Sequence, residues 1–245
     1  MGVLKMIRLP HFSDNVPLVV LAAGDYPSGV VTSHILQSAA KVVCCDGAAA
    51  EYIACGGRPY AIVGDCDSLP AGLQAEFSDI VHRFPDQQTN DLTKTVNFCI
   101  SHGLGHIVIL GATGKREDHT LANISLMAEY ITMSGVESVR MVTERMVLDA
   151  VAPEWCFDWE DANAIYERSG LFPEVGAQEF GFESVPGQQV SIFTPIPGVR
   201  ISTQGLMYPL ENSRLAGWWS GTLNEAVSDS FSIATTGPAI ICRVF

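Results

Sequence analysis

Over the first 143 residues, hydrophobic and polar positions follow two alternating patterns. Short apolar runs rich in β-branched residues are typical of buried strands, and they occur at Val16–Ala23, Val42–Cys45, Ala61–Val63, Ile80–Phe84, Ile107–Leu110 and Ser138–Thr143. Stretches of helical character separate them, at Ser33–Ala40, Ala48–Ala54, Leu73–Phe77, Leu92–Ser101 and Leu121–Met133. Strands that alternate with helices predict an α/β fold with a doubly wound, mostly parallel sheet covered on both faces.

The pattern changes after residue 185. Short apolar runs at Gln189–Thr194, Val199–Thr203, Phe231–Ala234 and Ala239–Val244 are separated by Pro and Gly, with little helical periodicity. This pattern predicts a second, smaller all-β domain of sandwich-like form. The predicted organisation is therefore an α/β domain over residues 1–150, a connecting segment over 151–184 and an all-β domain over 185–245.

The connecting segment is unusual in composition. Between Pro153 and Ser184 it holds eight acidic residues and one base, Arg168, together with seven aromatic residues that argue against a simple solvated linker. Asp158 is placed to cap a short helix that ends at Gly170. An ordered surface insertion, a functional lid and a patch that binds a partner all agree with this composition.

The net charge of -13 narrows the range of partners. Such a surface repels phosphate backbones and anionic lipid, so we expect neither nucleic acid nor a membrane as a partner. No apolar run is long enough for a bilayer-spanning helix, and we expect the apolar run at Val16–Ala23 to be a strand rather than part of a signal peptide. An odd number of cysteines without a CxxC spacing favours reduced thiols and a cytoplasmic location.

Two acidic loops follow predicted strands. The first holds Asp65 and Asp67, which in an extended segment would point the same way and could face one Mg²⁺ ion. The second runs from Asp86 to Lys94, where Thr89 or Asn90 can cap a helix that begins near Asp91. Solvated turns and helix capping explain much of both loops, but they do not explain why Lys94 lies one turn after Asp91.

A third loop, Gly111–His119, combines glycine with positive charge. A Gly-rich turn between a strand and a helix lets backbone N–H groups approach phosphate, and Lys115 and Arg116 add local cations. The spacing is not that of a Walker A loop, and an ordinary turn with Asp118 as helix cap is the alternative. Carboxylates and cations on three loops at one sheet edge together favour phosphoryl transfer.

These motifs, in their order along the chain, resemble those of the thiamine pyrophosphokinase family. The resemblance lies in Asp46–Ala49, Gly64–Ser68, Asp86–Lys94 and Gly111–His119, and it continues in the all-β part at Gly205–Leu210 and Gly221–Glu225. It implies an ATP-dependent transfer of a pyrophosphoryl group to the hydroxyl of thiamine, giving thiamine diphosphate and AMP, with Mg²⁺ as cofactor.

The resemblance also implies roles for individual residues. Asp65, Asp67 and Asp91 would be Mg²⁺ ligands. Lys94, Arg116 and Asp118 would complete the catalytic group. The nucleotide would be held by the remaining residues of the motifs, which are Asp46, Ser68, Asp86, Thr89, Asn90, Gly111, Thr113, Gly114, Lys115 and His119.

For the all-β domain, the resemblance implies that thiamine lies at a homodimer interface. The implied contacts are Tyr208, Trp218, Trp219, Thr222 and Asn224. If the chain is extended at the adjacent tryptophans, their rings point in opposite directions, so at most one is expected to stack on thiamine.

The chain departs from the family pattern at four positions. Gln88 stands where the family usually has Asp, Asn90 where it has Thr, Lys115 where it has Gly and Leu223 where it has Ser. Two other functions therefore stay open: a related ATP-dependent kinase of another small alcohol, and a non-catalytic protein that binds thiamine or a nucleotide.

Overall fold

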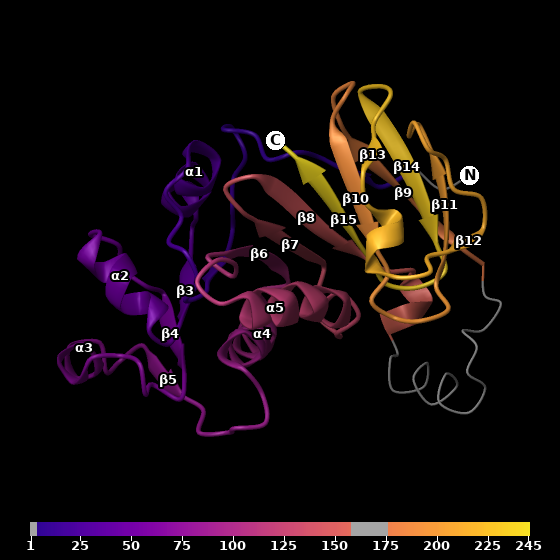
Figure 1. The fold of residues 1–245 in the computed structure, drawn as a ribbon. Helices are drawn as coiled ribbons and strands as arrows, with labels where there is room; N and C mark the ends of the chain where they lie inside the picture. Colours follow the sequence, from indigo (N-terminus) through magenta and orange to yellow (C-terminus); the bar gives the residue numbers. More distant parts are fainter. Residues whose placement is uncertain (1–3, 158–175) are drawn as a thin grey trace. The chain divides into compact units, whose positions relative to one another are not determined.

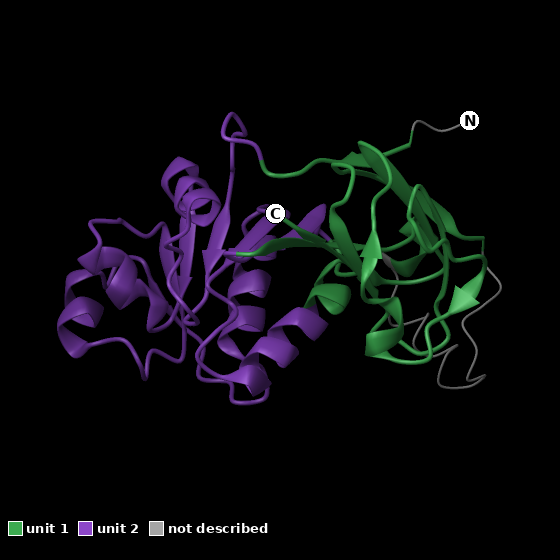
Figure 2. Cartoon of the chain, turned by 45° about the horizontal axis from the view of Figure 1, so that its top comes forward, with its two compact units in different colours: residues 1–10, 127–134, 145–245 green, residues 11–126, 135–144 purple. Residues whose placement is uncertain are grey.

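The computed structural model describes residues 4–157 and 176–245, and the chain divides into two compact units (Figure 2). The α/β unit comprises residues 11–126 and 135–144, and the β unit comprises residues 1–10, 127–134 and 145–245. Most of the acidic connecting segment, including the predicted helix from Asp158 to Gly170, lies outside the described residues.

The α/β unit contains a parallel sheet, as the alternating pattern predicts. Its strands are β2 (Val19–Leu21), β3 (Val42–Cys45), β4 (Ala61–Gly64), β5 (Val81–Arg83), β6 (His106–Leu110) and β7 (Ser138–Val142). They lie in the order β7-β6-β2-β3-β4-β5, and every neighbouring pair is parallel. The residues of β2, β3 and β4 are all buried, which explains their continuous apolar sequences.

Helices connect these strands (Figure 1). They are α1 (Val30–Ser38), α2 (Ala48–Ala54), α3 (Ala71–Glu76), α4 (Asp91–Ser101) and α5 (Glu117–Tyr130). After β5 the chain returns to the other side of β2 to form β6, so the strand order reverses between β2 and β6. This reversal is the point at which ligands bind in doubly wound sheets, beyond the carboxyl ends of the strands.

The β unit consists of two sheets around one hydrophobic core, which confirms the second, β-rich domain. One sheet has the order β1-β9-β14-β11-β12, and strands β13-β10-β15-β8 are hydrogen-bonded in that order in the other. The strands are β1 (Met6–Ile7), β8 (Met146–Val151), β9 (Gln178–Glu183), β10 (Gln189–Phe193), β11 (Arg200–Gln204), β12 (Ser213–Arg214), β13 (Asn224–Glu225), β14 (Ser230–Thr235) and β15 (Ala239–Val244). Two short 3₁₀ helices, η1 (Glu154–Phe157) and η2 (Trp218–Gly221), complete the unit, and side chains from both sheets, such as Phe182 and Ile241, share its core.

The contact-based division differs from the predicted domain boundaries. Strand β8 pairs with β15, and β1 pairs with β9, so residues 1–10 and 145–150 pack with the β unit rather than with the α/β part. Strand β9 itself comes from the stretch that the sequence assigned to the connecting segment. Within the described residues, no helix combines the length and the hydrophobicity needed to cross a membrane.

Candidate functional site

The loops that leave β2, β3, β4 and β6 line one cavity of the α/β unit. It has a volume of about 480 Å³ and lies at the point where the strand order reverses. Helix α4, whose N-terminus is capped by the Asn90 side chain accepting a hydrogen bond from the Thr93 N–H at 2.8 Å, supplies a further wall. We refer to it as the catalytic cavity, after the role that is proposed for it below.

Three carboxylates meet in this cavity. Oxygen atoms of Asp46, Asp65 and Asp91 lie within 4.8 Å of one another. They come from the ends of β3 and β4 and from the first turn of α4. Gly64 permits this approach, because a Cβ atom there would lie 2.8 Å from the Asp46 Cβ and 3.3 Å from Asp91 Oδ1.

Asp46 is the most constrained of the three. It is 4% exposed, and its backbone lies in the left-handed region with a φ of 33°. Its Oδ2 accepts a hydrogen bond from the Ser68 N–H at 3.1 Å, whereas its buried Oδ1 has no hydrogen-bond partner among the described residues. Burial raises the pKa of the Asp46 carboxyl, and the neighbouring Asp91 and Asp65 carboxylates raise it further. An acidic oxygen left bare in this way is suited to a cation.

Lys94 provides the positive charge that the cluster contains. Its side chain is buried, and Nζ lies 3.1 Å from Asp91 Oδ1 and 4.0 Å from Asp65 Oδ2. Asp65 also accepts hydrogen bonds from the Asp67 N–H and the Gln87 side chain, and these bonds, with the Lys94 charge, hold the pKa of its carboxyl below the usual range. One lysine among three carboxylates leaves the cluster negative, which again favours a cation.

Asp67 does not join this cluster. The loop is not extended, because Cys66 lies between the two acids with a φ of 65° and a buried side chain. The Asp67 side chain is exposed and does not line the cavity, and its backbone N–H turns back to Asp65. The expectation that Asp65 and Asp67 point the same way is therefore wrong for this structure, and the cluster contains Asp46 in place of Asp67.

The Gly-rich turn after β6 forms the opposite wall. Gly114, Lys115 and Arg116 line the cavity, and Lys115 Nζ donates a hydrogen bond to the Ala23 carbonyl at 3.0 Å. Arg116 forms a two-point ion pair with Asp118, whose pKa is lowered by that pair. Asp118 therefore orients Arg116 rather than lining the cavity.

The structure brings most of the predicted nucleotide and catalytic residues together. Those that line the cavity are Asp46, Asp65, Ser68, Thr89, Asn90, Asp91, Lys94, Gly114, Lys115, Arg116 and His119. Those outside the lining are Asp67, Asp86, Gly111, Thr113 and Asp118. Asp86 shapes its own loop instead, accepting hydrogen bonds from the backbone of Gln88 and from Thr89.

Part of the cavity lining was not predicted from the sequence. Ala22, Ala23 and Gly24, directly after β2, form one wall, and Gln87 and Asn123 contribute amides. The position of Ala22–Gly24 after the first strand was a usable signal, because that loop leaves the same sheet edge. These residues have no polar side-chain atoms and can offer a ligand only their backbone groups. For that reason their residue types did not mark them as candidates.

The predicted thiamine contacts lie in the β unit. Trp219 is 76% exposed, whereas the Trp218 ring packs 5.7 Å from the Phe193 ring. Both tryptophans lie in η2 and not in an extended segment. Asn224 is buried, and its amide exchanges two hydrogen bonds with the backbone of Tyr208. The Thr222 hydroxyl donates to the Trp219 carbonyl.

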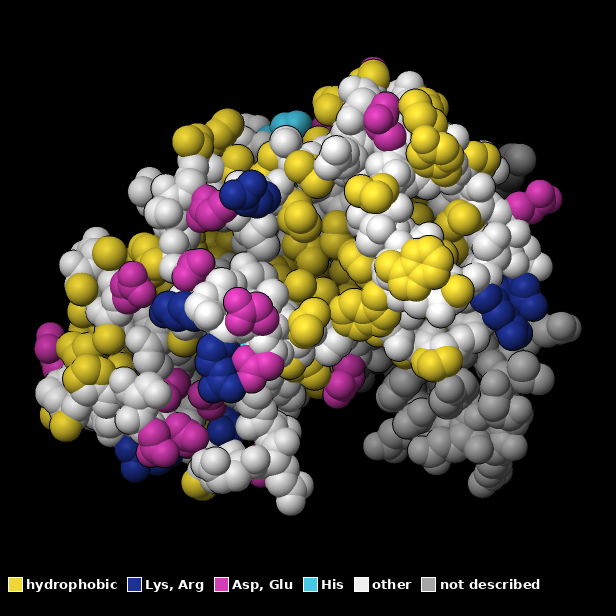
Figure 3. All heavy atoms as spheres, viewed as in Figure 1, with side chains coloured by type: hydrophobic (Ala, Val, Ile, Leu, Met, Phe, Trp, Pro, Cys, Tyr) yellow, Lys and Arg dark blue, Asp and Glu magenta, His cyan; other side chains and the backbone are white. Residues whose placement is uncertain are grey.

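The exposed side chains of this region are hydrophobic. Hydrophobic side chains gather on the face of the β unit shown in Figure 3. Tyr208, Trp219 and Leu223 are each more than 60% exposed, and they lie on neighbouring loops because Asn224 binds the Tyr208 backbone. Exposed apolar groups of this kind mark an interaction surface.

Comparison with protein families gives two matches. A model described as the thiamin pyrophosphokinase catalytic domain matches residues 32–138, and a model described as the thiamin pyrophosphokinase substrate-binding domain matches residues 170–242. Together the two models match most of the chain. The catalytic-domain model matches the main segment of the α/β unit, and the substrate-binding model matches the main segment of the β unit.

Two curated relatives are similar over shorter stretches. The chain is 33% identical over 79 residues to thiamin pyrophosphokinase 1 of Caenorhabditis elegans, covering 30% of this chain and 32% of the relative. It is 34% identical over 83 residues to thiamine pyrophosphokinase 1 of Oryza sativa subsp. japonica, covering 30% and 31%. The matched stretch thus spans about a third of the length of these relatives.

Solved structures share the fold at low identity. Yeast thiamin pyrophosphokinase aligns with a TM-score of 0.70 at 15% identity, covering 100% of this chain and 92% of that one. A thiamin pyrophosphokinase family protein from Enterococcus faecalis aligns with a TM-score of 0.69 at 16% identity, covering 94% and 99%. These structures show that the chain has a known fold.

Proposed function

Since the chain belongs to the thiamin pyrophosphokinase family, we propose that it transfers a pyrophosphoryl group from ATP to the hydroxyl oxygen of thiamine, giving thiamine diphosphate and AMP. The observation that carries the proposal is the cluster of Asp46, Asp65 and Asp91 beside Lys94, at the switch point of the sheet. In this reaction the thiamine hydroxyl attacks the β-phosphorus of ATP, the new O–P bond forms, and the bond to the AMP oxygen breaks.

The residues of the cluster fit a magnesium ion. Carboxylate oxygens are the ligands that Mg²⁺ takes in proteins, and the bare Asp46 Oδ1 is the strongest sign of such a site. Asp46, Asp65 and Asp91 would hold the ion, whereas Asp67 lies outside the cluster. When bound, Mg²⁺ would neutralise charge on the phosphate oxygens.

The protein's own groups would position the reactants. Lys94 and Arg116 are placed to bind phosphate oxygens, and the backbone N–H groups of the turn before α5 offer further donors. Phosphoryl transfer depends mainly on this positioning and on charge neutralisation. Ser68, Thr89, Asn90 and His119 would complete the nucleotide contacts.

Thiamine would bind to the β unit, and we propose a homodimer with the vitamin at its interface. The exposed Trp219, Tyr208 and Leu223 support this, because a partner would bury them. Stacking of a cationic thiazolium on an indole face favours Trp219, the more exposed tryptophan. Light scattering should give the mass of two chains at assay concentration, and an active monomer would contradict the dimer.

The proposed location is the cytoplasm. All seven cysteines are unpaired thiols, and all but Cys55 are buried. Burial raises the pKa of thiols such as Cys45 and Cys99 to about 12, which keeps them protonated and unreactive. Unpaired cysteines in this number fit a reducing compartment.

The deciding experiment incubates the protein with ATP, Mg²⁺ and thiamine and measures AMP. AMP that forms only when thiamine is present, in a 1:1 ratio with thiamine diphosphate, is the expected result. AMP formed only with another small alcohol would make the protein a related kinase. Tight thiamine or nucleotide binding without AMP would make it a non-catalytic binding protein.

A further inference from the structure

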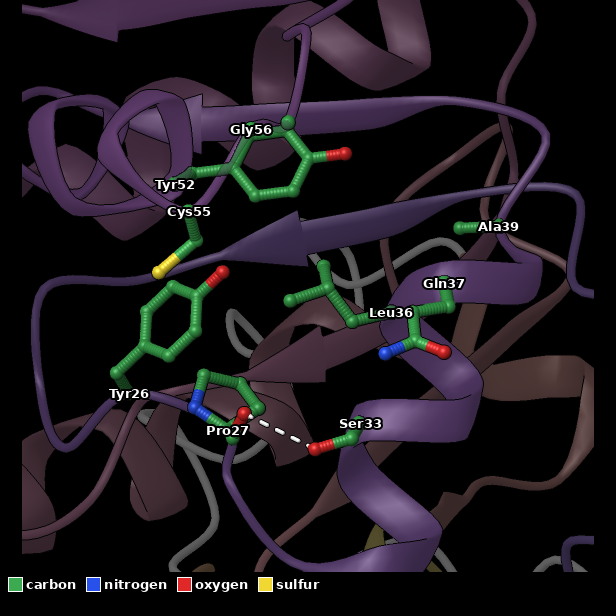
Figure 4. Close-up of a pocket in the computed structure, with 10 residues that line it drawn as sticks. Tyr26, Pro27, Ser33, Leu36, Gln37, Ala39, Tyr52, Cys55 and Gly56 are labelled. Atoms are coloured by element: carbon green, nitrogen blue, oxygen red, sulfur yellow. Dashed lines mark hydrogen bonds between the residues drawn. The ribbon is translucent and has the colours of Figure 1, made fainter.

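The α/β unit contains a second cavity that the transfer reaction does not use. It has a volume of about 370 Å³, within the range of small-molecule sites. The loop between β2 and α1 supplies Tyr26 and Pro27, α1 supplies Leu36 and Gln37, and the end of α2 supplies Tyr52 and Cys55 (Figure 4). None of its lining residues carries a charge.

Polar groups and aromatic rings converge in this cavity. Figure 4 shows the Tyr26 hydroxyl directed toward the Cys55 sulfur, with the Tyr52 ring on the other side of Cys55. Burial raises the pKa of both tyrosines, and the Cys55 thiol adds to the shift at Tyr26, so both hydroxyls stay neutral. Among the described residues, the Tyr52 hydroxyl and the Gln37 amide have no hydrogen-bond partner. These groups are therefore available to a ligand.

We propose that this cavity binds an uncharged, planar nitrogen heterocycle, of the size of a nucleobase or nucleoside, and that its occupancy is coupled to nucleotide binding in the catalytic cavity. Two tyrosine rings offer stacking surfaces, and hydroxyl and amide groups suit ring nitrogens and exocyclic amines. A charged ligand is disfavoured, because it would lose hydration without meeting a counter-charge.

The coupling follows from the walls that the two cavities share, and this part rests on the proposed function. The loop after β2 lines the catalytic cavity with Ala23 and Gly24 and the second cavity with Tyr26 and Pro27. The Gly24 N–H binds the Gly111 carbonyl at 2.6 Å, and the Asp25 N–H binds the Thr113 carbonyl at 2.8 Å. A ligand that moves Tyr26 therefore moves the Gly-rich turn.

Helix α2 makes a second connection. Gly47, at its N-terminus, lines the catalytic cavity beside Asp46, and Cys55, directly after its last residue, lines the second cavity. A helix of seven residues behaves as one rigid body, so displacement at one end reaches the other. Coupling between the sites must be reciprocal.

Cys55 provides a local reporter of binding. It is the only exposed residue among the seven cysteines, all of which are described. The rate of its alkylation by iodoacetamide is measured by mass spectrometry, with the catalytic cavity saturated by Mg²⁺ and a non-hydrolysable ATP analogue. The probes are adenosine, cytidine and nicotinamide at millimolar concentration, and at least one should slow alkylation about fivefold or more.

Two variants of α1 separate the site from the surface around it. Gln37→Trp places a large ring at the cavity and should abolish the protection of Cys55. Val30→Trp changes an exposed residue of the same helix that does not line the cavity, and it should leave the protection intact. Unchanged alkylation with all three probes, or equal protection in Gln37→Trp, would overturn the site.

A titration tests the coupling. The protecting probe should change the affinity of the ATP analogue about threefold or more in the natural protein and leave it unchanged in Gln37→Trp. Equal affinity with and without the probe would overturn the coupling. Alkylation and analogue binding need no turnover, so a failure of the second site is distinguishable from a failure of the proposed transfer reaction.

Discussion

At the scale of single residues, the cluster of Asp46, Asp65 and Asp91 holds more negative charge than Lys94 balances. Asp46 is buried with one bare oxygen and lies beside two other carboxylates. Its position after β3 could be predicted from sequence, and so could its place with the other motif residues that line the catalytic cavity. Its membership of the carboxylate cluster could not, because that depends on how closely β3 and β4 bring their loops together at Gly64.

Asp46→Asn should make the cation-free protein more stable and remove its response to Mg²⁺. The amide can still accept the hydrogen bond from the Ser68 N–H, and it removes one buried negative charge. A gain of about 1 kcal/mol corresponds to a rise of roughly 2–4 °C in Tm. Thermal unfolding with Mg²⁺ and with EDTA measures both effects. Asp79→Asn, an exposed substitution, is the control, and a Mg²⁺ shift of normal size in Asp46→Asn would exclude Asp46 as a ligand.

Lys115 is held in a strained conformation at the mouth of the same cavity. Its φ is 54°, and its ammonium reaches the Ala23 carbonyl. Residues other than glycine in this region cost of order 1–3 kcal/mol, and such strain is found at functional sites. Lysine at this position thus adds a cation at the expense of local strain.

Lys115→Gly and Lys115→Ala should separate charge from strain. Both variants lose the cation, so both should raise the KM for ATP about fivefold. Only the glycine variant relieves the strain, and its Tm should exceed that of Lys115→Ala by roughly 2–4 °C for about 1 kcal/mol. Steady-state kinetics and thermal unfolding give the two values. An unchanged KM in both variants would show that Lys115 does not bind phosphate.

At the scale of elements, the pattern of hydrophobic and polar residues predicted the strands β3 and β15 and the helix α2 with their observed bounds. Strand β8 was missed because its central Asp149 resembles a loop residue, and its partner Arg243 lies 94 residues later. Strand β9 holds the buried segment Phe180–Phe182 between polar residues, but the acidic composition of its surroundings obscured that pattern. The pattern of hydrophobic and polar residues in one sequence does not show which distant strands pair with each other.

Helix α1 begins with a cap supplied from another element. Its N-cap residue, Gly29, has no side chain, and Glu144 accepts hydrogen bonds from the Ser28 N–H and the Thr32 hydroxyl instead. Burial alone would raise the pKa of Glu144, but bonds from Thr32, Gly29 and Ser28 outweigh it and lower the pKa. A carboxylate with a lowered folded-state pKa stabilises the fold at neutral pH and loses that effect as the pH falls.

Glu144→Gln should therefore destabilise the protein in a pH-dependent way. At pH 7 the loss should be about 1 kcal/mol, the usual worth of a helix cap, and it should shrink as the pH falls below about 4.3 toward the folded-state pKa. Urea denaturation from pH 7 down to about pH 2 gives the difference, with the exposed Glu76→Gln as the matched control. A difference that stays constant over this range would mean that the charge of Glu144 is irrelevant.

Helix η2 presents two tryptophans with different surroundings. Trp219→Ala should leave Tm nearly unchanged, because the indole is exposed. It should raise the KM for thiamine about tenfold, because the exposed indole can stack on the thiazolium cation of thiamine. Trp218→Ala should instead lower stability by about 1 kcal/mol through the lost contact with Phe193. Thermal unfolding and thiamine kinetics on both variants test this assignment, and the reverse pattern would exchange the two roles.

At the scale of the whole molecule, the β unit is built from both ends of the chain, and the buried side chain of Arg243 connects these segments. Arg243 is fully buried and binds Asp149 of β8, the Glu183 carbonyl of β9 and the Ile7 and Arg8 carbonyls near the N-terminus. The sequence predicted the two-unit fold class, but it could not show that residues 1–10 belong with the C-terminal unit. That knowledge depends on the pairing of β1 with β9.

Arg243→Met should cost about 3–5 kcal/mol, because it removes the buried ion pair between Arg243 and Asp149. Arg243→Met with Asp149→Leu should recover much of this loss, since no charge then remains unpaired. Urea denaturation measures both, and Arg214→Met, an exposed substitution in β12, is the control. A double variant as unstable as the single one would assign the loss to the backbone carbonyls that Arg243 binds.

The pairing of Met6 with Gly181 also determines when β1 can form its hydrogen bonds during biosynthesis. At roughly 5–20 residues per second, a ribosome needs about 10–30 s to add the intervening chain. During that interval the first strand has emerged and its neighbour does not yet exist, whereas the parallel sheet can already close. In the nascent polypeptide, the segment that forms the parallel sheet, from β2 to β7, should therefore acquire protease resistance before β1 does.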